Sequence, residues 1–441
     1  MYRKLRNHRQ LWVIFPLLIA ACGPAQELSD TGSGPGEAVS GLSPNGEIQV
    51  LRDGEVTRTV PAEYIPLDYP EMPWRGDPGI GASQDGTLYV ALYHRIFYSN
   101  DGGRSWDFHP IPAEILEPPE GPTDGSVGNY DSFLVLRDGT LLWAYRGAAE
   151  TDHVIRSTDG GKTWEPWSRI EEMSPYDSAG GNQNCMVELK DGTLLWPTRL
   201  GPRGEYLEAR RKQIEGGSSW TGPPSWTTYL YRSQDGGRNW GDKSLLQEWG
   251  TEAHVFQLSS GRLLAAIRYQ RTGAAPAPAN EPDYLADADR RTDIPNPSGI
   301  RPGRGNQSTV GKRVFLADSI DTGRTWTDFR PLWRKAGGPM DIAFGEAHGH
   351  LCQLSDGTVI LVHERRYPYE QGDIRARVSR DEGRTWLPEV YQLSSGHGFG
   401  ASVVLADDTI VTAVGNSPLD EKGRNPSGKW IAQVVRWRLA E

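Results

Sequence analysis

The sequence predicts an all-β protein, a six-bladed β-propeller, and three observations support this prediction. The chain has 441 residues with 52 Gly, 32 Pro and 16 Trp. This composition has too many helix breakers for a helical protein and too many aromatic residues for a disordered one. One turn motif recurs five times, and a second turn motif alternates with it. Repetition of this kind is typical of propellers, in which each repeat forms one blade.

The first motif is the pattern Ser-x-Asp-x-Gly-x-x-Trp. Its five copies occupy residues 99–106, 157–164, 233–240, 319–326 and 379–386. In each copy the Asp carboxylate can accept hydrogen bonds from the backbone of its own turn. The Gly supplies a left-handed backbone position, and the Trp can fold back between neighbouring sheets. We therefore expect five hairpin turns of one design, with a structural role.

The second motif is an Asp-Gly turn between two apolar strands, which is a strong signal for a β-hairpin. It or a related form occurs at residues 85–86, 138–139, 191–192, 260–261, 356–357 and 407–408. Six such turns predict six four-stranded blades. The last blade lacks one strand, and residues 48–60 can supply it and close the ring.

The N-terminal residues have the pattern of an export signal. Basic residues between 3 and 9 precede an apolar run over 11–21 that is too short to span a bilayer, so residues 1–21 are predicted to be a signal peptide. The ending Ile-Ala-Ala-Cys resembles the lipobox of bacterial lipoproteins, which implies cleavage before Cys22 and lipidation of this residue. Residues 22–46 are rich in Gly, Pro and Ser and are expected to form a flexible tether. The propeller is expected to occupy residues 47–441.

These features indicate an exported bacterial lipoprotein, held at the cell surface or in the periplasm by its lipid anchor alone. The net charge of −10 makes nucleic acid an unsuitable partner. Cys185 and Cys352 fall on non-neighbouring blades, so we expect two buried free thiols. Two isolated cysteines cannot build a Cys-rich metal site, and no metal or other cofactor is expected.

The strand order places the starts of the first strands and the ends of the second strands at one face, opposite the five turns. Eight residues before the Asp-Gly-type turns stand Asp77, Tyr130, Gln183, Glu252, His348 and Phe399, with Asp131, Asn184, His254 and His350 beside them. Eight residues after three of these turns stand Arg146, Arg199 and Arg268. Arginines from several blades could converge there on a carboxylate or another anion. We therefore expect the functional site at this face.

The five-fold turn repeat, known as the Asp box or BNR repeat, together with the blade length and the export signal, resembles the sialidase superfamily. The resemblance implies an exo-α-sialidase-like glycosidase with an arginine triad, a Tyr nucleophile activated by a Glu, and an Asp acid/base. The segment around residues 251–268 resembles the one that carries the activating Glu and the second arginine, which implies these roles for Glu252 and Arg268. The third arginine would be Arg366 or Arg365, and Arg75 is the candidate for the first.

Two departures from the sialidase pattern leave the chemistry open. Phe399 stands where the Tyr nucleophile is expected, and the acid/base Asp has only Asp77 and Asp131 as candidates. Asp131 and Glu252 could instead form an acid/base pair, and His348 or His350 could serve in hydrolysis or in β-elimination. We therefore predict a glycosidase acting on sialic acid or a uronic acid of extracellular glycans. The alternatives are a non-catalytic glycan-binding propeller and a lyase for uronic-acid polysaccharides.

Overall fold

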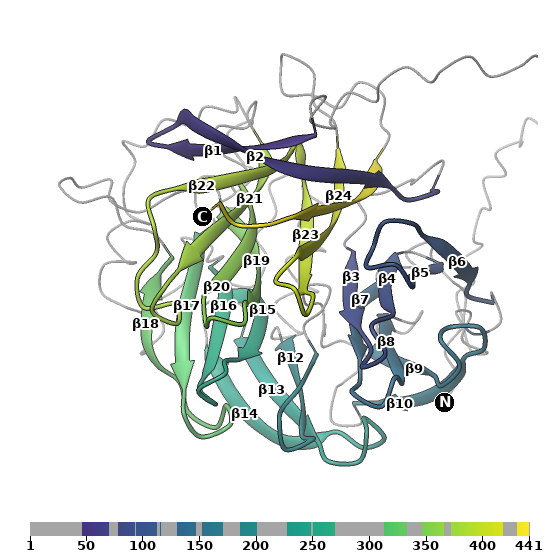
Figure 1. Cartoon of the computed structure of the whole chain (residues 1–441). Coiled ribbons are helices and arrows are strands. Elements are labelled where there is room, and N and C mark those ends of the chain that lie inside the picture. The colour runs from purple at the N-terminus through teal and green to yellow at the C-terminus, as the bar shows by residue number, and fades with distance from the viewer. Residues whose placement is uncertain are drawn as a thin grey trace, which may run out of the picture. The chain divides into compact units, whose positions relative to one another are not determined.

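In the computed structural model, the described part of the chain consists mainly of β-strands. The described residues are 46–69, 78–92, 94–112, 115, 130–146, 152–170, 186–200, 227–247, 250–269, 313–332, 346–365, 372–417 and 430–440. They form antiparallel β-sheets (Figure 1). Within this part of the chain, no helix has the length and apolar character needed to cross a membrane. The chain divides into two compact units, Met1–Ala38 and Val39–Glu441, and every described residue belongs to the second.

Four sheets are separate blades of four antiparallel strands, each running outward in chain order. They are β3 (Gly79–Ala82), β4 (Leu88–Leu92), β5 (Arg95–Ser99) and β6 (Asp107–Pro110); β7 (Tyr130–Val135), β8 (Leu141–Arg146), β9 (Asp152–Ser157) and β10 (Glu165–Arg169); β11 (Val187–Glu188), β12 (Leu194–Leu200), β13 (Thr227–Ser233) and β14 (Gly241–Gln247); and β15 (Gly250–Gln257), β16 (Leu263–Tyr269), β17 (Arg313–Ser319) and β18 (Thr327–Pro331).

The remaining strands form one continuous sheet of nine. Its order is β19 (Glu346–Gln353), β20 (Val359–Arg365), β21 (Asp373–Ser379), β22 (Val390–Ser395), β1 (Glu47–Arg52), β2 (Glu55–Pro66), β25 (Ile431–Trp437), β24 (Ile410–Ser417) and β23 (His397–Val404). The all-β propeller is confirmed, but the prediction of six separate blades is corrected to four blades and this joined sheet. The cause is the β1–β2 hairpin. As expected, β2 pairs with β25, but β1 also pairs with β22 and so connects the two halves.

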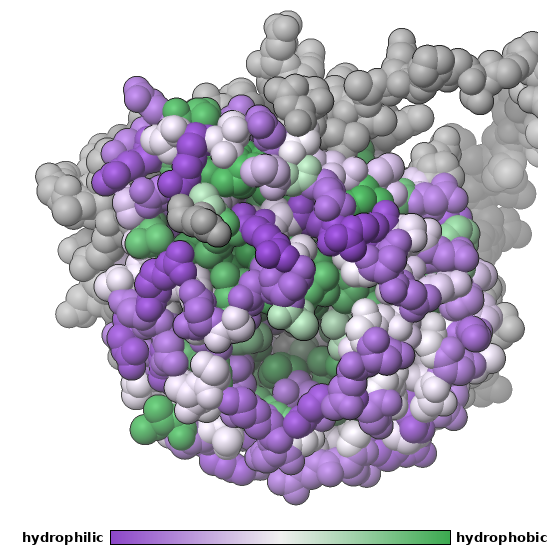
Figure 2. All heavy atoms as spheres, in the orientation of Figure 1, coloured by the Kyte–Doolittle hydropathy of each residue, from purple (hydrophilic) through white to green (hydrophobic). Residues whose placement is uncertain are grey.

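Inner strands of several neighbouring sheets contact one another. β3 contacts β7, β15 contacts both β12 and β19, and β23 contacts both β19 and β3, which joins the last strands of the chain to the first blade. Apolar side chains fill the space between neighbouring sheets, as where Leu67 and Phe97 pack with Val434. In the view of Figure 2, polar residues cover most of the described surface, and apolar residues show mainly in the recess between the sheets.

The free thiol of Cys352 lies buried in the core of the nine-stranded sheet. Burial raises the pKa of this thiol to about 12, because the thiolate would lose its hydration there. The prediction of a buried free thiol is confirmed for Cys352. Cys185, to which the same prediction applies, lies outside the described residues.

The five Ser-x-Asp-x-Gly-x-x-Trp turns share one hydrogen-bond design. In the first turn the Asp101 carboxylate accepts bonds from the backbone N–H of Arg104 and Ser105, both at 2.9 Å, and from the Ser105 hydroxyl. Chiefly the bond from the Ser105 hydroxyl, with help from the backbone bonds, lowers the pKa of Asp101 below its usual range. The fifth turn meets an Asp-Gly-type turn through a 3.1 Å bond from Ser260 to Glu382. Both kinds of turn therefore lie at the same end of the strands.

Candidate active site

Three residues predicted for the site meet at the opposite end of the strands. Glu252 stands near the start of β15, Arg268 near the end of the adjacent β16, and His348 near the start of β19. Nη1 of Arg268 donates a hydrogen bond to Oε2 of Glu252 and lies 3.1 Å from Nε2 of His348. Nδ1 of His348 lies 3.0 Å from the same carboxylate oxygen. The three residues are 9%, 5% and 4% exposed, so this is a largely desolvated ionic cluster.

A fourth charged group, Glu364 at the end of β20, is not among the predicted site residues. Its Oε2 lies 3.8 Å from Nε2 of His348, and its Oε1 accepts a 3.1 Å hydrogen bond from the backbone N–H of Gly398. The sequence does carry a signal for it. Glu364 stands eight residues after the turn residue Asp356, the same register that selects Arg146, Arg199 and Arg268. The resemblance to sialidases favours the neighbouring arginines at 365 and 366 instead.

Phe399, at the start of β23, forms the apolar side of the cluster. Its ring meets the imidazole of His348 edge-on, with centroids 3.9 Å apart and planes at 69°. His348 itself has a positive φ of 56° and lies in an irregularity of the β19–β20 pairing between Ala347 and His350. Non-glycine residues in this backbone region are strained, and such strain is found preferentially at functional sites.

His350 occupies a different environment from His348, although it is only two residues away. Its ring stacks on that of His254 with centroids 4.0 Å apart. Nδ1 of His254 accepts a hydrogen bond from the backbone of Leu351 at 3.0 Å, and Nδ1 of His350 accepts one from the backbone of Ser402 at 3.2 Å. Burial lowers the pKa of His254 to about 3 and that of His350 well below its usual value. The two rings connect β15, β19 and β23.

The other candidates are described in part or not at all. Tyr130, Asp131, Arg146 and Arg199 stand at the expected ends of β7, β8 and β12, but their side chains lie outside the described part. Arg75, Asp77, Asn184, Arg366 and Cys22 lie wholly outside the described residues. Arg365, the alternative to Arg366, pairs with the buried Asp373 at 2.8 Å. Among the described residues, no group of three or more His, Cys, Asp or Glu could hold a metal ion.

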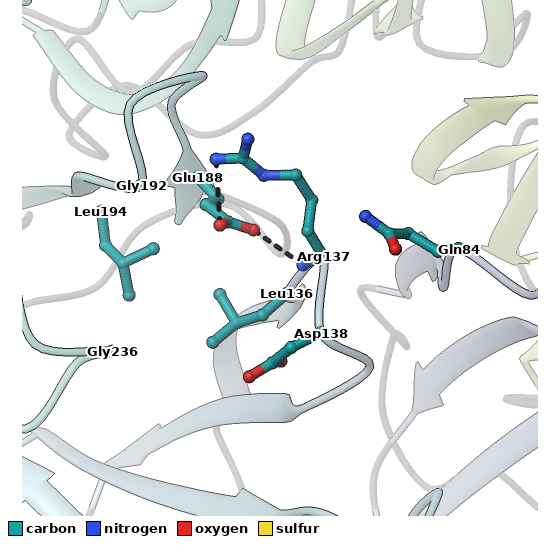
Figure 3. A pocket seen from close by; sticks show the side chains of 8 residues that line it. All are labelled: Gln84, Leu136, Arg137, Asp138, Glu188, Gly192, Leu194 and Gly236. Carbon is teal, nitrogen blue, oxygen red and sulfur yellow. Dashed lines mark hydrogen bonds and ion pairs between the residues drawn. The ribbon is translucent and has the colours of Figure 1, made fainter.

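A cavity of about 500 Å³ lies near the turns of the first three blades and is lined by residues that include Gln84, Arg137 and Glu188 (Figure 3). The Glu188 carboxylate accepts the backbone N–H of Arg137 at 2.8 Å and pairs with its guanidinium at 3.0 Å. The same guanidinium donates to the carbonyl of Lys190 at 3.0 Å. The charged groups of this cavity are thus engaged in joining one blade to the next. We therefore place the candidate site at the Glu252 cluster and not at this cavity.

A sialidase from Bacteroides fragilis (strain YCH46) is 22% identical over 236 residues. The match covers 45% of this chain and 40% of that protein, so it spans less than half of the relative's length. No family model matches the chain.

The solved structures resemble the chain over nearly its whole length. An α-L-arabinofuranosidase from Fusarium graminearum superposes with a TM-score of 0.54 at 12% identity, covering 90% of this chain and 99% of that one. A protein of unknown function from Dyadobacter fermentans DSM 18053 superposes with a TM-score of 0.53 at 18% identity, covering 88% of this chain and 100% of that one. A Trypanosoma rangeli sialidase superposes with a TM-score of 0.50 at 12% identity, covering 89% of this chain and 58% of that one. The chain therefore has a sialidase-like β-propeller fold, and the resemblance predicted from its repeat is confirmed.

Proposed function

We propose that the protein is a glycoside hydrolase that removes or cleaves an acidic sugar, sialic acid or a uronic acid, from extracellular glycans. The observation that carries this proposal is the position of the Glu252 carboxylate. It accepts a hydrogen bond from Arg268 and lies beside His348, at the end of the strands where several blades meet. Glycoside hydrolysis depends on carboxyl groups as acids, bases or nucleophiles. Glu252 has the largest exposed side-chain fraction, 11%, among Glu252, Arg268, His348 and Glu364, and is the group we expect to meet the substrate.

The choice of an acidic sugar rests on the arginines. A guanidinium binds a carboxylate through two parallel hydrogen bonds, and Arg268 lies in the described part of the site. Arg75, Arg146, Arg199 and Arg366 remain predicted contributors from other blades. Phe399 carries no nucleophilic atom, so we propose that Glu252 works with Asp131 or with His348 in place of a tyrosine.

Product analysis tests the proposal. The full-length protein is incubated in detergent with a sialoside and with a panel of acidic polysaccharides, beside Glu252→Gln and a matched control, Glu382→Gln. Glu382 lies in the fifth turn, at the other end of the strands, so its variant should retain wild-type activity. We expect release of the acidic sugar by the wild type and at least a thousandfold loss in Glu252→Gln, about 4 kcal/mol of transition-state stabilisation.

The other outcomes separate the alternatives. An unsaturated product that absorbs ultraviolet light would replace the hydrolase with a lyase. Retention of a glycan without any product would indicate a non-catalytic glycan-binding propeller. Neither binding nor turnover across the panel would overturn the proposed function.

We further propose that the nine-stranded sheet counts as two blades, which makes a six-bladed ring, and that the protein is exported and anchored through Cys22. The first proposal is supported by the two runs of four neighbouring strands, β19–β20–β21–β22 and β2–β25–β24–β23, within that sheet. For the second, labelling cells with a radioactive fatty acid should mark the wild type. An equally strong label in Cys22→Ala would contradict the lipid anchor.

A further inference from the structure

A basic side chain of β21 lies at the level of the Glu252 cluster and has no part in the proposed function so far. Arg375 faces His363 on β20 in the strand pairing, and the neighbouring Val362 faces His350 on β19. Neighbouring strands of a sheet are about 4.8 Å apart, so Arg375 lies two spacings, roughly 10 Å, outward from β19. It is therefore at the same height as the cluster but farther from the inner strands.

The side chain of Arg375 lies on the face of its sheet that is turned toward the fourth blade. Paired and alternate residues share one face, so Arg375 lies on the same side as His363 and Leu361. Leu361 belongs to the same core cluster as Leu264 of the fourth blade. That blade also carries Glu252, on β15. A glycan that extends outward from Glu252 along this face would therefore reach Arg375.

One buried carboxylate fixes the orientation of Arg375. Asp373 is 0% exposed, and its Oδ1 accepts a 2.6 Å hydrogen bond from Nε of Arg375. The same carboxylate also accepts bonds from Nε and Nη2 of Arg365, at 3.1 and 2.8 Å, and from the Gln392 amide at 3.0 Å. Its oxygens are thus supplied with donors while only one nitrogen of Arg375 is in use.

The far end of the Arg375 guanidinium, formed by Nη1 and Nη2, is available to a ligand. Within the described part of the chain, Asp373 is the one residue that hydrogen-bonds Arg375. The side chain is 16% exposed, so water and solutes reach it. Two parallel N–H groups in this arrangement bind a carboxylate through two hydrogen bonds.

The neighbouring basic groups favour an anion at this position. Burial is the main cause that lowers the pKa of Arg365 and Arg377, and repulsion by the charge of Arg375 lowers both further. A bound anion would offset that repulsion. Arg377 itself is 5% exposed and donates to Glu346 at 3.4 Å, so it supports the charge of the position without reaching a ligand.

We propose that Arg375 is a specificity-determining residue that binds a second carboxylate of the glycan, on a sugar farther along the chain than the one at Glu252. The inference rests on the proposed function, in which Glu252 meets an acidic sugar. It narrows the substrate class, because a glycan with acidic groups on several of its sugars binds better than one with a single acidic sugar. Arg375 does not touch the bond that is cleaved, so it acts on binding and not on the chemical step.

The test is calorimetric titration of the full-length protein, in detergent, with two pairs of probes. One pair is trigalacturonate and galacturonate, and the other is a disialyl and a monosialyl lactose. We expect the wild type to prefer the probe with more carboxylates at least tenfold in one pair. Arg375→Met, which retains the apolar stem, should remove that preference and leave the affinity for the single-carboxylate probe within about twofold. Arg380→Met is the matched control, because Arg380 follows the other end of β21 and pairs with Asp356 at 3.1 Å; it should retain the wild-type preference.

A preference that is unchanged in Arg375→Met would overturn the inference, and so would a wild type that binds no probe or binds both members of each pair equally. If Arg375→Met does not fold, Arg375→Lys replaces it, since lysine keeps the charge but cannot form two parallel hydrogen bonds. It should reduce the preference about threefold, and an unreduced preference would again overturn the inference.

The titration also separates this inference from the proposed function. Binding that depends on Arg375, in a protein that releases no product, would reject the hydrolase alone. Cleavage of an acidic glycan by a wild type without the preference would reject the role of Arg375 alone. Where cleavage occurs, Arg375→Met should raise KM for the glycan with several carboxylates about tenfold and leave kcat unchanged.

Discussion

The imidazole rings of His254 on β15 and His350 on β19 stack with their centroids 4.0 Å apart and their planes within 24° of each other. Each ring uses Nδ1 to accept a backbone hydrogen bond from the next inner strand. The pair therefore connects the fourth blade, β19 and β23 in the interior of the ring. It can do so only while both rings are neutral, because a proton on Nδ1 would remove the acceptor of each bond and leave a charge without solvation.

This contact predicts that the protein loses stability in mild acid. Burial lowers the pKa of His254 to about 3, and burial together with the neighbouring His254 lowers that of His350 well below its usual value. Because both rings regain a pKa near 6.5 on unfolding, the unfolded state binds more protons below that pH. The free energy of unfolding is therefore not reduced by these rings above about pH 6.5. Below that pH it falls toward pH 3, by roughly 1.4 kcal/mol per pH unit for each ring.

Thermal unfolding followed by calorimetry between pH 4 and 8 measures this loss. His254→Gln is the informative variant, since it removes one titrating ring and retains a hydrogen-bond acceptor. Its melting temperature should be lower at pH 8 but should fall less steeply with acid than that of the wild type. Equal slopes in the two proteins would show that the stacked pair does not control the acid response.

The parts of the site that can be predicted from sequence are those fixed by repetition. Each blade repeats one register around its Asp-Gly-type turn, so counting from the turns is enough to place Glu252, Arg268 and His348 at one end of the strands. The same count reaches Glu364, but the sialidase resemblance favours the two arginines that follow it. The five turns are predictable for a similar reason, since every bond of the design lies within eight residues.

What cannot be predicted from sequence depends on contacts between distant segments. The joined sheet arises because Val50 on β1 pairs with Tyr391 on β22, a contact that no local pattern specifies. The different environments of His348 and His350 depend on a positive φ and a shifted register in β19, and neither leaves a signal in the residue types.

The thiol of Cys352 is predicted to be unreactive in the folded protein. Its pKa is raised to about 12 by burial, so at pH 8 the thiolate fraction is on the order of one in ten thousand, and the surrounding core excludes reagents. Incubation with iodoacetamide followed by peptide mapping should leave Cys352 unmodified in the native protein and label it fully in urea. Labelling of the native protein at the rate seen in urea would mean that the core of the nine-stranded sheet opens readily.

The C-terminal strand is predicted to hold the ring closed through one arginine. Nε of Arg436 on β25 donates a 2.8 Å hydrogen bond to the carbonyl of Gly102, in the first turn of the first blade, and its guanidinium pairs with Glu63. Arg436→Met should lower the free energy of unfolding by about 1–3 kcal/mol, because the part-buried carbonyl loses its donor. Arg438→Met is the control. Arg438 pairs with Asp407 at the surface, and an exposed pair contributes less than about 1 kcal/mol. Equal urea midpoints for the two variants would contradict a closing role for Arg436.

Gly398 is predicted to be required for the site to form. A methyl group on its Cα would overlap the backbone of Gly415 and Asn416 on β24, and backbone atoms of a paired strand cannot move aside as a flexible side chain can. Gly398→Ala should therefore cost at least about 3 kcal/mol of stability and displace the N–H that bonds Glu364. The matched substitution is Gly241→Ala on β14, where a Cβ would meet nothing within 4 Å and stability should be unchanged or raised by up to about 1 kcal/mol. Urea unfolding of both variants measures the difference. If Gly398→Ala unfolds at the wild-type midpoint, β23 can shift without cost, and the close approach that fixes Glu364 beside His348 is not a rigid feature of the fold.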